Sequence, residues 1–506
     1  MLTFVFMKRL FILISIFASY AAASAQADVQ KYLDSLDRVA PLDESVWGAC
    51  AVRADGRRIA SIHEMHKMVP ASNLKLVTTG IAMKALGADF EFETTLACNG
   101  QVVDGVLQGD LYIVGGGDPT LGSDDSISIP RTALLRQFRS FLEKEGITRI
   151  TGRIIGDGRF FDGESDLGSW QYEDIGTYYG TGGDGLSYNK NVQEIRVEAG
   201  KKAGDSLSVK VLYPYTPWMR FSLRCTTGKP GTGDQLYLYT NDLAPVSELR
   251  GTYGAGRPPK TVKISNKFGA YTFANTLCAY LRSSGIAVDG GPADIDHSGN
   301  IRTDLSRDAS YAPAARVKDL RIIGSVKSPS LKRIAYVTNH ESDNFYAETL
   351  LRMTGRSLTG SACYDSSLVA GHRVMKSLKV NDFAGASIVD GSGLSRKNYI
   401  SPDFMCRFLS GMMSDGCFED YIATFGQTAD SYPARLRKAS AEQQARVYMK
   451  SGSMGGVRCF SGYIEPSVGS KSDAIIFSIM VNNVIVPVSR VDPIIDRIIA
   501  LLAADN

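Results

Sequence analysis

The two ends of this chain predict the same kind of structure, and this symmetry is the strongest constraint on its fold. Near the N-terminus a short helix is followed by strand-like segments at 46–52 and 57–63, joined by an Asp-Gly turn typical of a β-hairpin. Near the C-terminus, strand-like segments at 460–464 and 474–482 precede an amphipathic helix at 493–503. One antiparallel sheet built from both ends and covered by the terminal helices is the simplest fold that satisfies both patterns.

The middle of the chain has a different character. From about residue 90 to 310 glycines are frequent, the strand-like runs are short, and helical periodicity is scarce, whereas helices return after residue 315. With 506 residues the chain is also longer than one core usually serves. We therefore expect an α+β protein in which residues 28–90 and 310–506 form one domain and residues 91–309 form a large, mainly β insertion.

The first 27 residues have the features of a secretory signal. Lys8-Arg9 is a basic segment, residues 10–17 are apolar, and small-x-small cleavage sites occur at Ala23-Ser24-Ala25 and Ala25-Gln26-Ala27. The apolar run is shorter than the ~20 residues of a membrane span, although an uncleaved anchor helix is the alternative. We expect export to the periplasm or another extracytoplasmic compartment, with no transmembrane helix in the mature chain.

Charge and cysteine content exclude several classes of function. The formal net charge is +3, and removal of the signal lowers it to +1, which gives no electrostatic footprint for nucleic acid. The eight cysteines fit an oxidising compartment, but none forms a C-x-x-C pair and no Cys/His group has zinc-binding spacing. We expect neither a metal nor another cofactor.

A serine and a lysine three residues apart begin the helix expected at residues 72–86. Positions i and i+3 share a helix face, so the Lys75 amine is expected beside the Ser72 hydroxyl. Burial and nearby positive charge would lower the lysine pKa and let it act as a base. Alone, this S-x-x-K pattern is weak, because a second copy from Ser187 to Lys190 precedes a strand-like run and is expected to be structural.

A second pattern, Ser342-Asp343-Asn344, lies in a connection between two expected helices. A third pattern, Lys450-Ser451-Gly452, follows at an expected strand end. The set S-x-x-K, S-D-N and K-T-G, in this order, is the signature of class A β-lactamases and penicillin-binding proteins. The three patterns together predict an acyl-transfer enzyme with a serine nucleophile.

Each residue of these patterns has an expected role. Ser342 would relay a proton toward the leaving group, and Asn344 would hold the substrate amide. Lys450 and Ser451 would bind a substrate carboxylate. The remaining roles belong to backbone positions: Gly452 would leave room for an acyl chain, and the N–H groups of Ser72 and Ser453 would form the oxyanion hole.

With these residues in place, the chain resembles the class C low-molecular-mass penicillin-binding proteins, the D-alanyl-D-alanine carboxypeptidase/endopeptidases. The resemblance extends over nearly the whole mature chain and includes L-Y-I-V-G-G-G-D-P-T-L at 111–121, G-R-I-I-G-D at 152–157 and D-G-S-G-L-S-R at 390–396. The 270 residues between Ser72 and Ser342 also fit, since this gap is far shorter in β-lactamases. One departure is Ser451, where the family more often has threonine.

The resemblance implies a penicillin-binding, serine β-lactamase-like domain with an antiparallel sheet flanked by helices. It also implies cleavage of D-Ala-D-Ala, or of peptide crosslinks, in peptidoglycan through a Ser72 acyl-enzyme, with β-lactams as covalent inhibitors. Family members that favour meso-diaminopimelate grip its free end in a side pocket, and similar residues here are Asp174, Tyr179 and Arg396. Asp174 is equally compatible with a solvated loop acid.

Three alternatives stay open from the sequence. A class A-like β-lactamase would need an E-x-x-L-N segment between Asn344 and Lys450, and none is found there; Glu348 is expected on a helix surface. A serine esterase on the same fold and a non-catalytic wall-binding protein are the others, although intact motifs favour an enzyme. No histidine lies in the motifs, which argues against a Ser-His-Asp triad.

Overall fold

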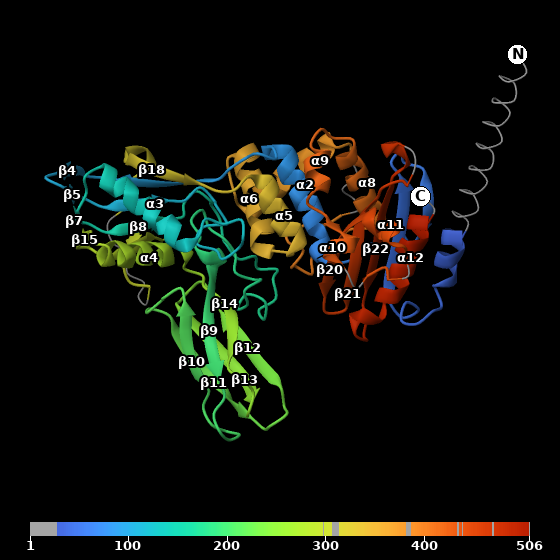
Figure 1. Cartoon of the computed structure of the whole chain (residues 1–506), viewed down its shortest axis with the longest axis horizontal. Coiled ribbons are helices and arrows are strands. Elements are labelled where there is room, and N and C mark those ends of the chain that lie inside the picture. The colour runs from blue at the N-terminus through green and yellow to red at the C-terminus, as the bar shows by residue number, and fades with distance from the viewer. Residues whose placement is uncertain are drawn as a thin grey trace, which may run out of the picture. The chain divides into compact units, whose positions relative to one another are not determined.

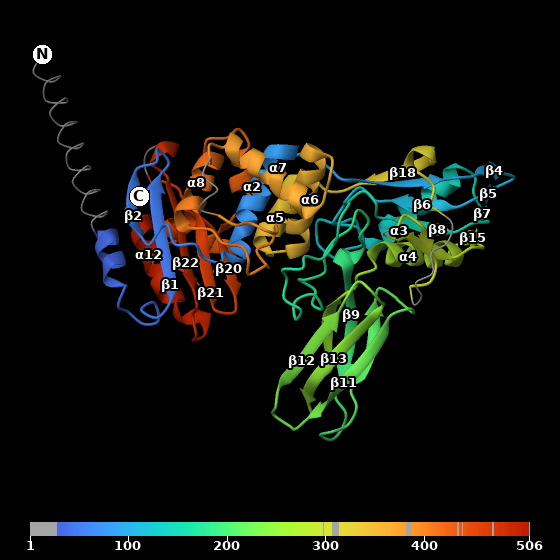
Figure 2. The ribbon, with the colours of Figure 1, turned by 180° about the vertical axis from the view of Figure 1, so that it is seen from behind.

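The computed structural model describes residues 28–504, apart from 297, 306–312, 381–385, 433–434, 438 and 468–469. The expected signal at residues 1–27 lies outside the described residues. The chain divides into two compact units, which are described separately below (Figures 1 and 2). Unit 1 comprises the chain up to Lys84, Ala335–Ser342 and Gly371 onward, and unit 2 comprises Ala85–Ile334 and Asp343–Ala370.

Unit 1 is built on one six-stranded sheet in the order β19-β20-β21-β22-β1-β2, in which all neighbours are antiparallel. The N-terminal β1 pairs along its whole length with the C-terminal β22, which confirms the sheet expected from the two chain ends. The strand bounds are β1 Val46–Arg53, β2 Arg58–Ile62, β19 Gly426–Gln427, β20 Val447–Met454, β21 Val457–Ile464 and β22 Ile475–Asn482.

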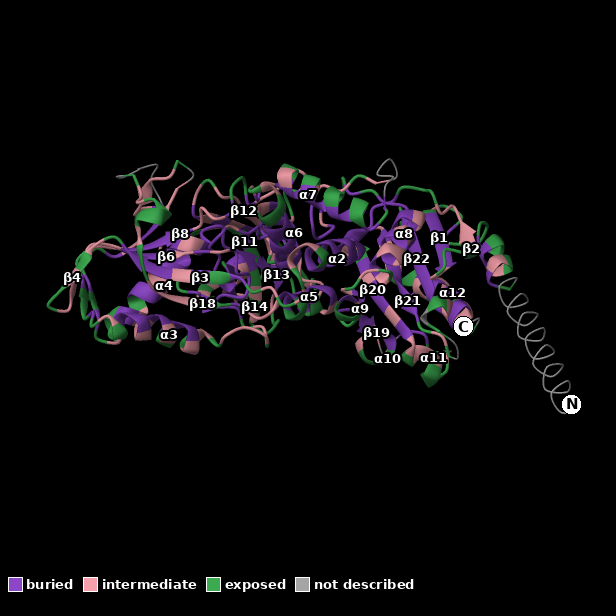
Figure 3. Cartoon of the chain, turned by 90° about the horizontal axis from the view of Figure 1, so that it is seen from above, coloured by how far each residue is buried: buried purple, intermediate pink, exposed green. Residues whose placement is uncertain are grey.

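The central strand β22 separates two layers because its side chains alternate between the faces of the sheet. Its odd-numbered residues from Ile475 to Val481 join a buried apolar cluster with helix α12, Asp492–Ala504. On the other face, helix α8 (Pro402–Met413) packs against β22 and β1. Figure 3 shows that β22 is buried on both faces, as expected for a strand between two helical layers.

The S-x-x-K segment begins a buried central helix of unit 1. A 3₁₀ turn, Ala71–Leu74, leads directly into α2, Lys75–Leu86, and Gly87 follows with φ +89°. The expectation that Ser72 begins the α-helix itself was therefore wrong by one turn, because Ser72 lies in the 3₁₀ turn. Most α2 residues are buried all around the helix, so α2 is a core helix rather than a surface one.

Further helices surround this arrangement. One of them, α7, has a mixed polar sequence and was not expected. The helix bounds are α5 Leu331–His340, α7 Tyr364–Ser377, α9 Phe418–Ile422, α10 Thr428–Ser431 and α11 Ala441–Ala445. Helices α2, α5 and α7 each cross a boundary between the units.

Unit 2 is strand-rich, in agreement with the mainly β insertion. Its largest sheet has the order β17-β16-β8-β6-β3-β18 and shares a core with α3 (Arg131–Lys144) and α4 (Gly269–Ser283). The strands of this sheet are β3 Glu93–Cys98, β6 Leu111–Val114, β8 Ile154–Asp157, β16 Pro292–Ile295, β17 Ile301–Arg302 and β18 Arg321–Lys327. Helix α6, Asn344–Thr359, also belongs to this unit.

Three smaller sheets complete the described part of unit 2, and two of them share an apolar cluster. Their strands are β4 Gln101–Val103, β5 Val106–Gln108, β7 Arg149–Ile150 and β15 Ala287–Val288; β9 Val192–Glu198, β10 Ser208–Tyr213 and β14 Lys260–Ser265; and β11 Arg220–Gly228, β12 Asp234–Thr240 and β13 Val246–Gly254. The expected domain limits at residues 90 and 310 remain a prediction; the compact units divide at Lys84 and Ile334 and assign residues 343–370 to unit 2.

Candidate active site

The Ser72 and Lys75 side chains meet as the sequence predicts. The Lys75 Nζ donates a hydrogen bond of 2.8 Å to the Ser72 Oγ and another of 2.8 Å to the Ser392 carbonyl. Lys75 is fully buried, whereas Ser72 is half-buried. An amine in direct contact with a hydroxyl is the arrangement that proton transfer from the serine requires.

The backbone beside Ser72 is held in an uncommon conformation. Ala71 has φ +47°, and Ser342 of the second motif has φ +58°. Non-glycine residues adopt this left-handed region rarely, and surrounding structure must stabilise it. Both positions adjoin or contain a predicted catalytic serine, a distribution typical of functional sites.

Lys450 lies next to Ser342 in unit 1. Its Nζ donates hydrogen bonds to the Ser342 Oγ at 3.1 Å and to the Ser451 carbonyl at 2.8 Å. Burial, and then the positive charge of Lys75, hold the pKa of Lys450 well below its ordinary value. Segments 72–75, 342 and 450–451, which are hundreds of residues apart, thus supply neighbouring groups of one unit.

The third motif lies inside a strand and not at a strand end, which corrects the expectation. Strand β20 continues to Met454, so Lys450, Ser451, Gly452 and Ser453 all pair with β21. On its other side, β20 pairs with β19 only at 448–449, and no described strand continues that ladder. The motif therefore occupies a sheet edge, where an extended peptide can add as a further strand.

Gly452 lies where β20 approaches the segment that contains Ser72, and its expected role toward an acyl chain remains a prediction. A Cβ at this position would lie 2.5 Å from the Pro70 carbonyl oxygen and 2.8 Å from the Asn73 nitrogen. Real Cβ atoms essentially never approach other atoms this closely. Gly452 is thus required because β20 touches the backbone of the 3₁₀ turn that contains the predicted nucleophile Ser72, hereafter the nucleophile turn. The sequence alone did not reveal this contact.

Asn73, inside the S-x-x-K motif, is a functional candidate that the sequence reasoning missed. Its side chain is fully buried, and its Nδ2 donates to the Lys450 carbonyl at 2.5 Å. The Ser461 hydroxyl of β21 donates to the Asn73 Oδ1 at 2.5 Å and lies 2.9 Å from the Ser478 hydroxyl. This network joins the nucleophile turn to three strands; the only sequence signal was a polar residue within a buried helix start.

The remaining predicted substrate residues divide between the units. In unit 2, the Asn344 Nδ2 donates to the Tyr179 carbonyl at 2.9 Å. Burial raises the pKa of Tyr179, whose hydroxyl also interacts with the Asp174 carboxylate, so these three residues form one group. In unit 1, the Arg396 guanidinium donates to the Gly455 carbonyl at 3.2 Å, beside the β20–β21 turn.

Comparison with known proteins identifies the family. The family model of the D-Ala-D-Ala carboxypeptidase 3 (S13) family matches residues 26–504, almost the entire chain. The chain belongs to the S13 D-Ala-D-Ala carboxypeptidase family. It is accordingly a serine D-Ala-D-Ala carboxypeptidase, as the three motifs predicted.

Relatives of this S13 carboxypeptidase agree with the assignment. A D-alanyl-D-alanine carboxypeptidase of Actinomadura sp. (strain R39) is 26% identical over 90% of this chain and 82% of that protein. A penicillin-sensitive carboxypeptidase A of Dictyostelium discoideum is 23% identical over 90% and 87%. The crystal structure of penicillin-binding protein 4 from Haemophilus influenzae shares the fold, with a TM-score of 0.76, 20% identity, and coverage of 94% of this chain and 98% of that one.

The second S-x-x-K copy of the S13 carboxypeptidase has a structural role, as expected. The Lys190 Nζ forms ion pairs of 3.0 Å with both Asp125 and Asp343, whereas Ser187 bonds to the backbone of Asp184. Glu348, by contrast, is buried on α6 and does not lie on the helix surface that the sequence suggested.

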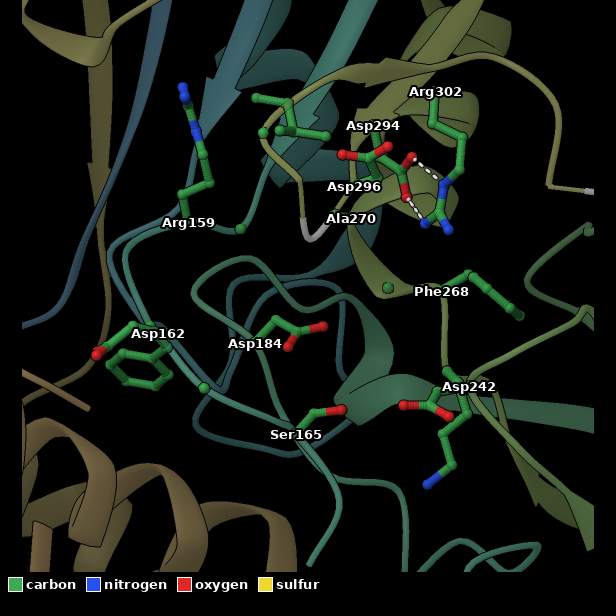
Figure 4. A pocket seen from close by; sticks show the side chains of 17 residues that line it. Arg159, Asp162, Ser165, Asp184, Asp242, Phe268, Ala270, Asp294, Asp296 and Arg302 are labelled. Carbon is green, nitrogen blue, oxygen red and sulfur yellow. Dashed lines mark hydrogen bonds and ion pairs between the residues drawn. The ribbon is translucent and has the colours of Figure 1, made fainter. Parts of the chain in front are cut away.

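A charged cavity of about 300 Å³ lies within unit 2 (Figure 4). Two of its cations are already held by carboxylates: Arg302 pairs with Asp294 at 2.6 Å, and the buried Lys267 pairs with Asp166 at 2.8 Å. Among the described residues, no three His, Cys, Asp or Glu side chains converge as a metal site. The third cation, Arg159, pairs with Asp157 at 2.6 Å, so these three cations form structural ion pairs.

Proposed function

We propose that Ser72 is the acylated nucleophile of this carboxypeptidase and that Lys75 is its general base. The observation that carries the proposal is the 2.8 Å contact between the Lys75 Nζ and the Ser72 Oγ. In the buried setting of Lys75, a neutral amine can accept the serine proton as the oxygen attacks the carbonyl of the penultimate D-alanine.

The same unit offers groups for the next steps. The backbone N–H groups of Ser72 and Ser453 would stabilise the oxyanion of the tetrahedral intermediate. Lys75 and Ser342 would then pass the proton to the amine of the leaving D-alanine as its bond to the carbonyl carbon breaks. Lys450, 3.1 Å from the Ser342 hydroxyl, would bind the carboxylate of that D-alanine together with Ser451. Water then hydrolyses the acyl-enzyme.

Residues other than Lys75 and Lys450 would recognise the rest of the peptide. The acyl chain of the substrate would lie along the open edge of β20, a mode that provides backbone hydrogen bonds. Asn344 would hold the substrate amide. Asp174, Tyr179 and Arg396 would bind the free end of a diaminopimelate arm.

The family and the secretory signal predicted at residues 1–27 support an extracytoplasmic setting. The enzyme would act outside the cytoplasm, which in a Gram-negative cell means the periplasm. It would cleave peptidoglycan peptides as a carboxypeptidase, a D,D-endopeptidase or both. β-Lactam antibiotics would acylate Ser72 and inhibit it. None of the helices in the described part of the chain combines the length and apolar character of a membrane span.

Intact-mass spectrometry after incubation with penicillin tests the nucleophile. We expect a single adduct on the wild-type enzyme, mapped to Ser72 by peptide digestion, and no adduct on Ser72→Ala. A Ser187→Ala variant, which changes the second S-x-x-K copy, is the matched control and should be acylated like the wild type. An adduct on Ser72→Ala would refute the assignment, and rapid turnover of penicillin would favour a β-lactamase.

Digestion of purified muropeptides separates the two peptidase activities. Release of free D-alanine from monomeric pentapeptides indicates carboxypeptidase action, and conversion of crosslinked dimers to monomers indicates endopeptidase action. Loss of both activities in Ser72→Ala is expected.

A further inference from the structure

Asp390 is a buried carboxylate in unit 1 that belongs to none of the three motifs. It is fully buried and accepts hydrogen bonds from the backbone N–H groups of Gly393 at 2.8 Å and Ser395 at 2.7 Å, and from the Asn398 Nδ2 at 2.8 Å. Burial of a carboxylate is costly unless such donors satisfy it. The bonds fold residues 389–398, hereafter the Asp390 loop, around one side chain.

The Asp390 loop presents its backbone carbonyls to the nucleophile helix. The Ser392 carbonyl accepts the 2.8 Å hydrogen bond from the Lys75 Nζ, and the Gly391 carbonyl accepts one of 2.6 Å from the Thr78 hydroxyl. These two carbonyls lie between Asp390 and Gly393, whose backbone N–H donates to the Asp390 carboxylate. The conformation of the Asp390 loop therefore determines the position of the Ser392 carbonyl relative to the Lys75 amine.

The loop also touches the turn that carries the nucleophile. Gly393 has φ +82°, and a Cβ there would lie 1.9 Å from the Ala71 carbonyl oxygen. Only glycine allows this approach. The loop consequently contacts both partners of the proposed acylation step, the turn of Ser72 and the amine of Lys75.

We propose that Asp390 is a positioning residue for acylation, because it holds the loop that places the Ser392 carbonyl against the Lys75 amine. The proposal rests on the proposed role of Lys75 as the general base. A neutral amine has two N–H groups and one lone pair. When one N–H is directed to the Ser392 oxygen, rotation about the last side-chain bond is restricted and the lone pair can face the Ser72 hydroxyl. After proton transfer, the same carbonyl stabilises the ammonium.

Asp390→Asn tests the proposal because it keeps the side-chain volume. The amide replaces one acceptor oxygen by a donor, which then faces a backbone N–H, so the loop must rearrange. We expect the second-order rate constant for acylation by penicillin to fall about 10- to 100-fold. Because the displaced carbonyl no longer favours the ammonium, the acidic limb of the pH–rate profile should move to lower pH.

Asp403→Asn is the matched control, since Asp403 is a largely buried carboxylate of the same unit that pairs with Arg58 and Arg407. It should lower the melting temperature while the acylation rate per active site and the pH profile stay unchanged. An Asp390→Asn enzyme whose rate and acidic limb both match the wild type would refute the positioning role. Failure of the wild type to be acylated at Ser72 would instead refute the underlying mechanism.

Discussion

Replacement of Gly452 by alanine probes the contact between β20 and the nucleophile turn. The new Cβ would lie 2.5 Å from the Pro70 oxygen and 2.8 Å from the Asn73 nitrogen. Both obstructing atoms belong to the backbone, so no side-chain rotation relieves the overlap. The strand and the turn must separate by about 0.5 Å or more before the shorter distance reaches 3.0 Å, the lower limit for real Cβ contacts.

This displacement sets the size of both expected effects. Overpacking of a tightly packed site costs about 1–3 kcal/mol, which corresponds to a fall in melting temperature of roughly 2–12 °C for a unit of this size. The proposed oxyanion donors lie on the two segments that separate. Because a misplacement of about 1 Å can cost 10²-fold in rate, acylation should slow by roughly 10- to 100-fold.

Stopped-flow acylation by a chromogenic or fluorescent penicillin, combined with thermal unfolding, measures both quantities. Gly416→Ala is the control, because nothing lies within 4 Å of a Cβ at that position in the same unit. It should change neither the acylation rate nor the melting temperature appreciably. An unaltered acylation rate in Gly452→Ala would show that the close approach does not position the reacting groups.

Three other substitutions have defined outcomes. Lys450→Met should abolish peptidase activity yet raise the free energy of unfolding at neutral pH by about 1–4 kcal/mol. Burial holds the pKa of Lys450 in the folded protein well below its value in the unfolded chain, so this gain in unfolding free energy should vanish above pH ~10.5 and increase as the pH falls. Urea titrations at several pH values measure it. Asn73→Ala removes the amide that donates to the Lys450 carbonyl and accepts from the Ser461 hydroxyl. It should cost about 1–3 kcal/mol by the same measurement, with slower acylation. Lys267→Met should cost about 3–5 kcal/mol because Asp166 would be left unpaired, and calorimetry should show that adding Asp166→Asn restores most of the loss.

Features set by local patterns were predictable from the sequence. The hairpin of β1 and β2, the C-terminal strands and helix α12 follow from alternation and helical spacing, and their pairing into one sheet follows from the need to bury both apolar faces. The Ser72–Lys75 contact was predictable for the same reason, because helical spacing of three residues fixes it.

Features set by tertiary neighbours were not predictable. Lys450 to Ser453 read as a strand end because their polar side chains and glycine interrupt the apolar pattern, yet β21 supplies a full ladder of partners through Met454. The side-chain contacts of Asn73 are made with groups more than 300 residues away, and those of Asp390 exist only in the folded loop. Neither set of contacts can be inferred from the local sequence.

The two S-x-x-K copies differ in how the fold holds the backbone and the lysine amine. Ser72 follows a residue with φ +47°, a strained conformation that persists only where the surroundings determine it. Backbone contacts hold the turn on two sides. Gly452 of β20 and Gly393 of the Asp390 loop approach it too closely for any side chain at either position. The copy beginning at Ser187 also has left-handed backbone, but there the lysine amine is engaged by two aspartates. We therefore infer that the serine–lysine spacing serves the proposed proton transfer only where the fold holds the turn in place and the lysine amine contacts the serine hydroxyl, as Lys75 does. An acidic residue beside Lys75, as in Thr78→Asp, should divert the amine from Ser72 and suppress acylation.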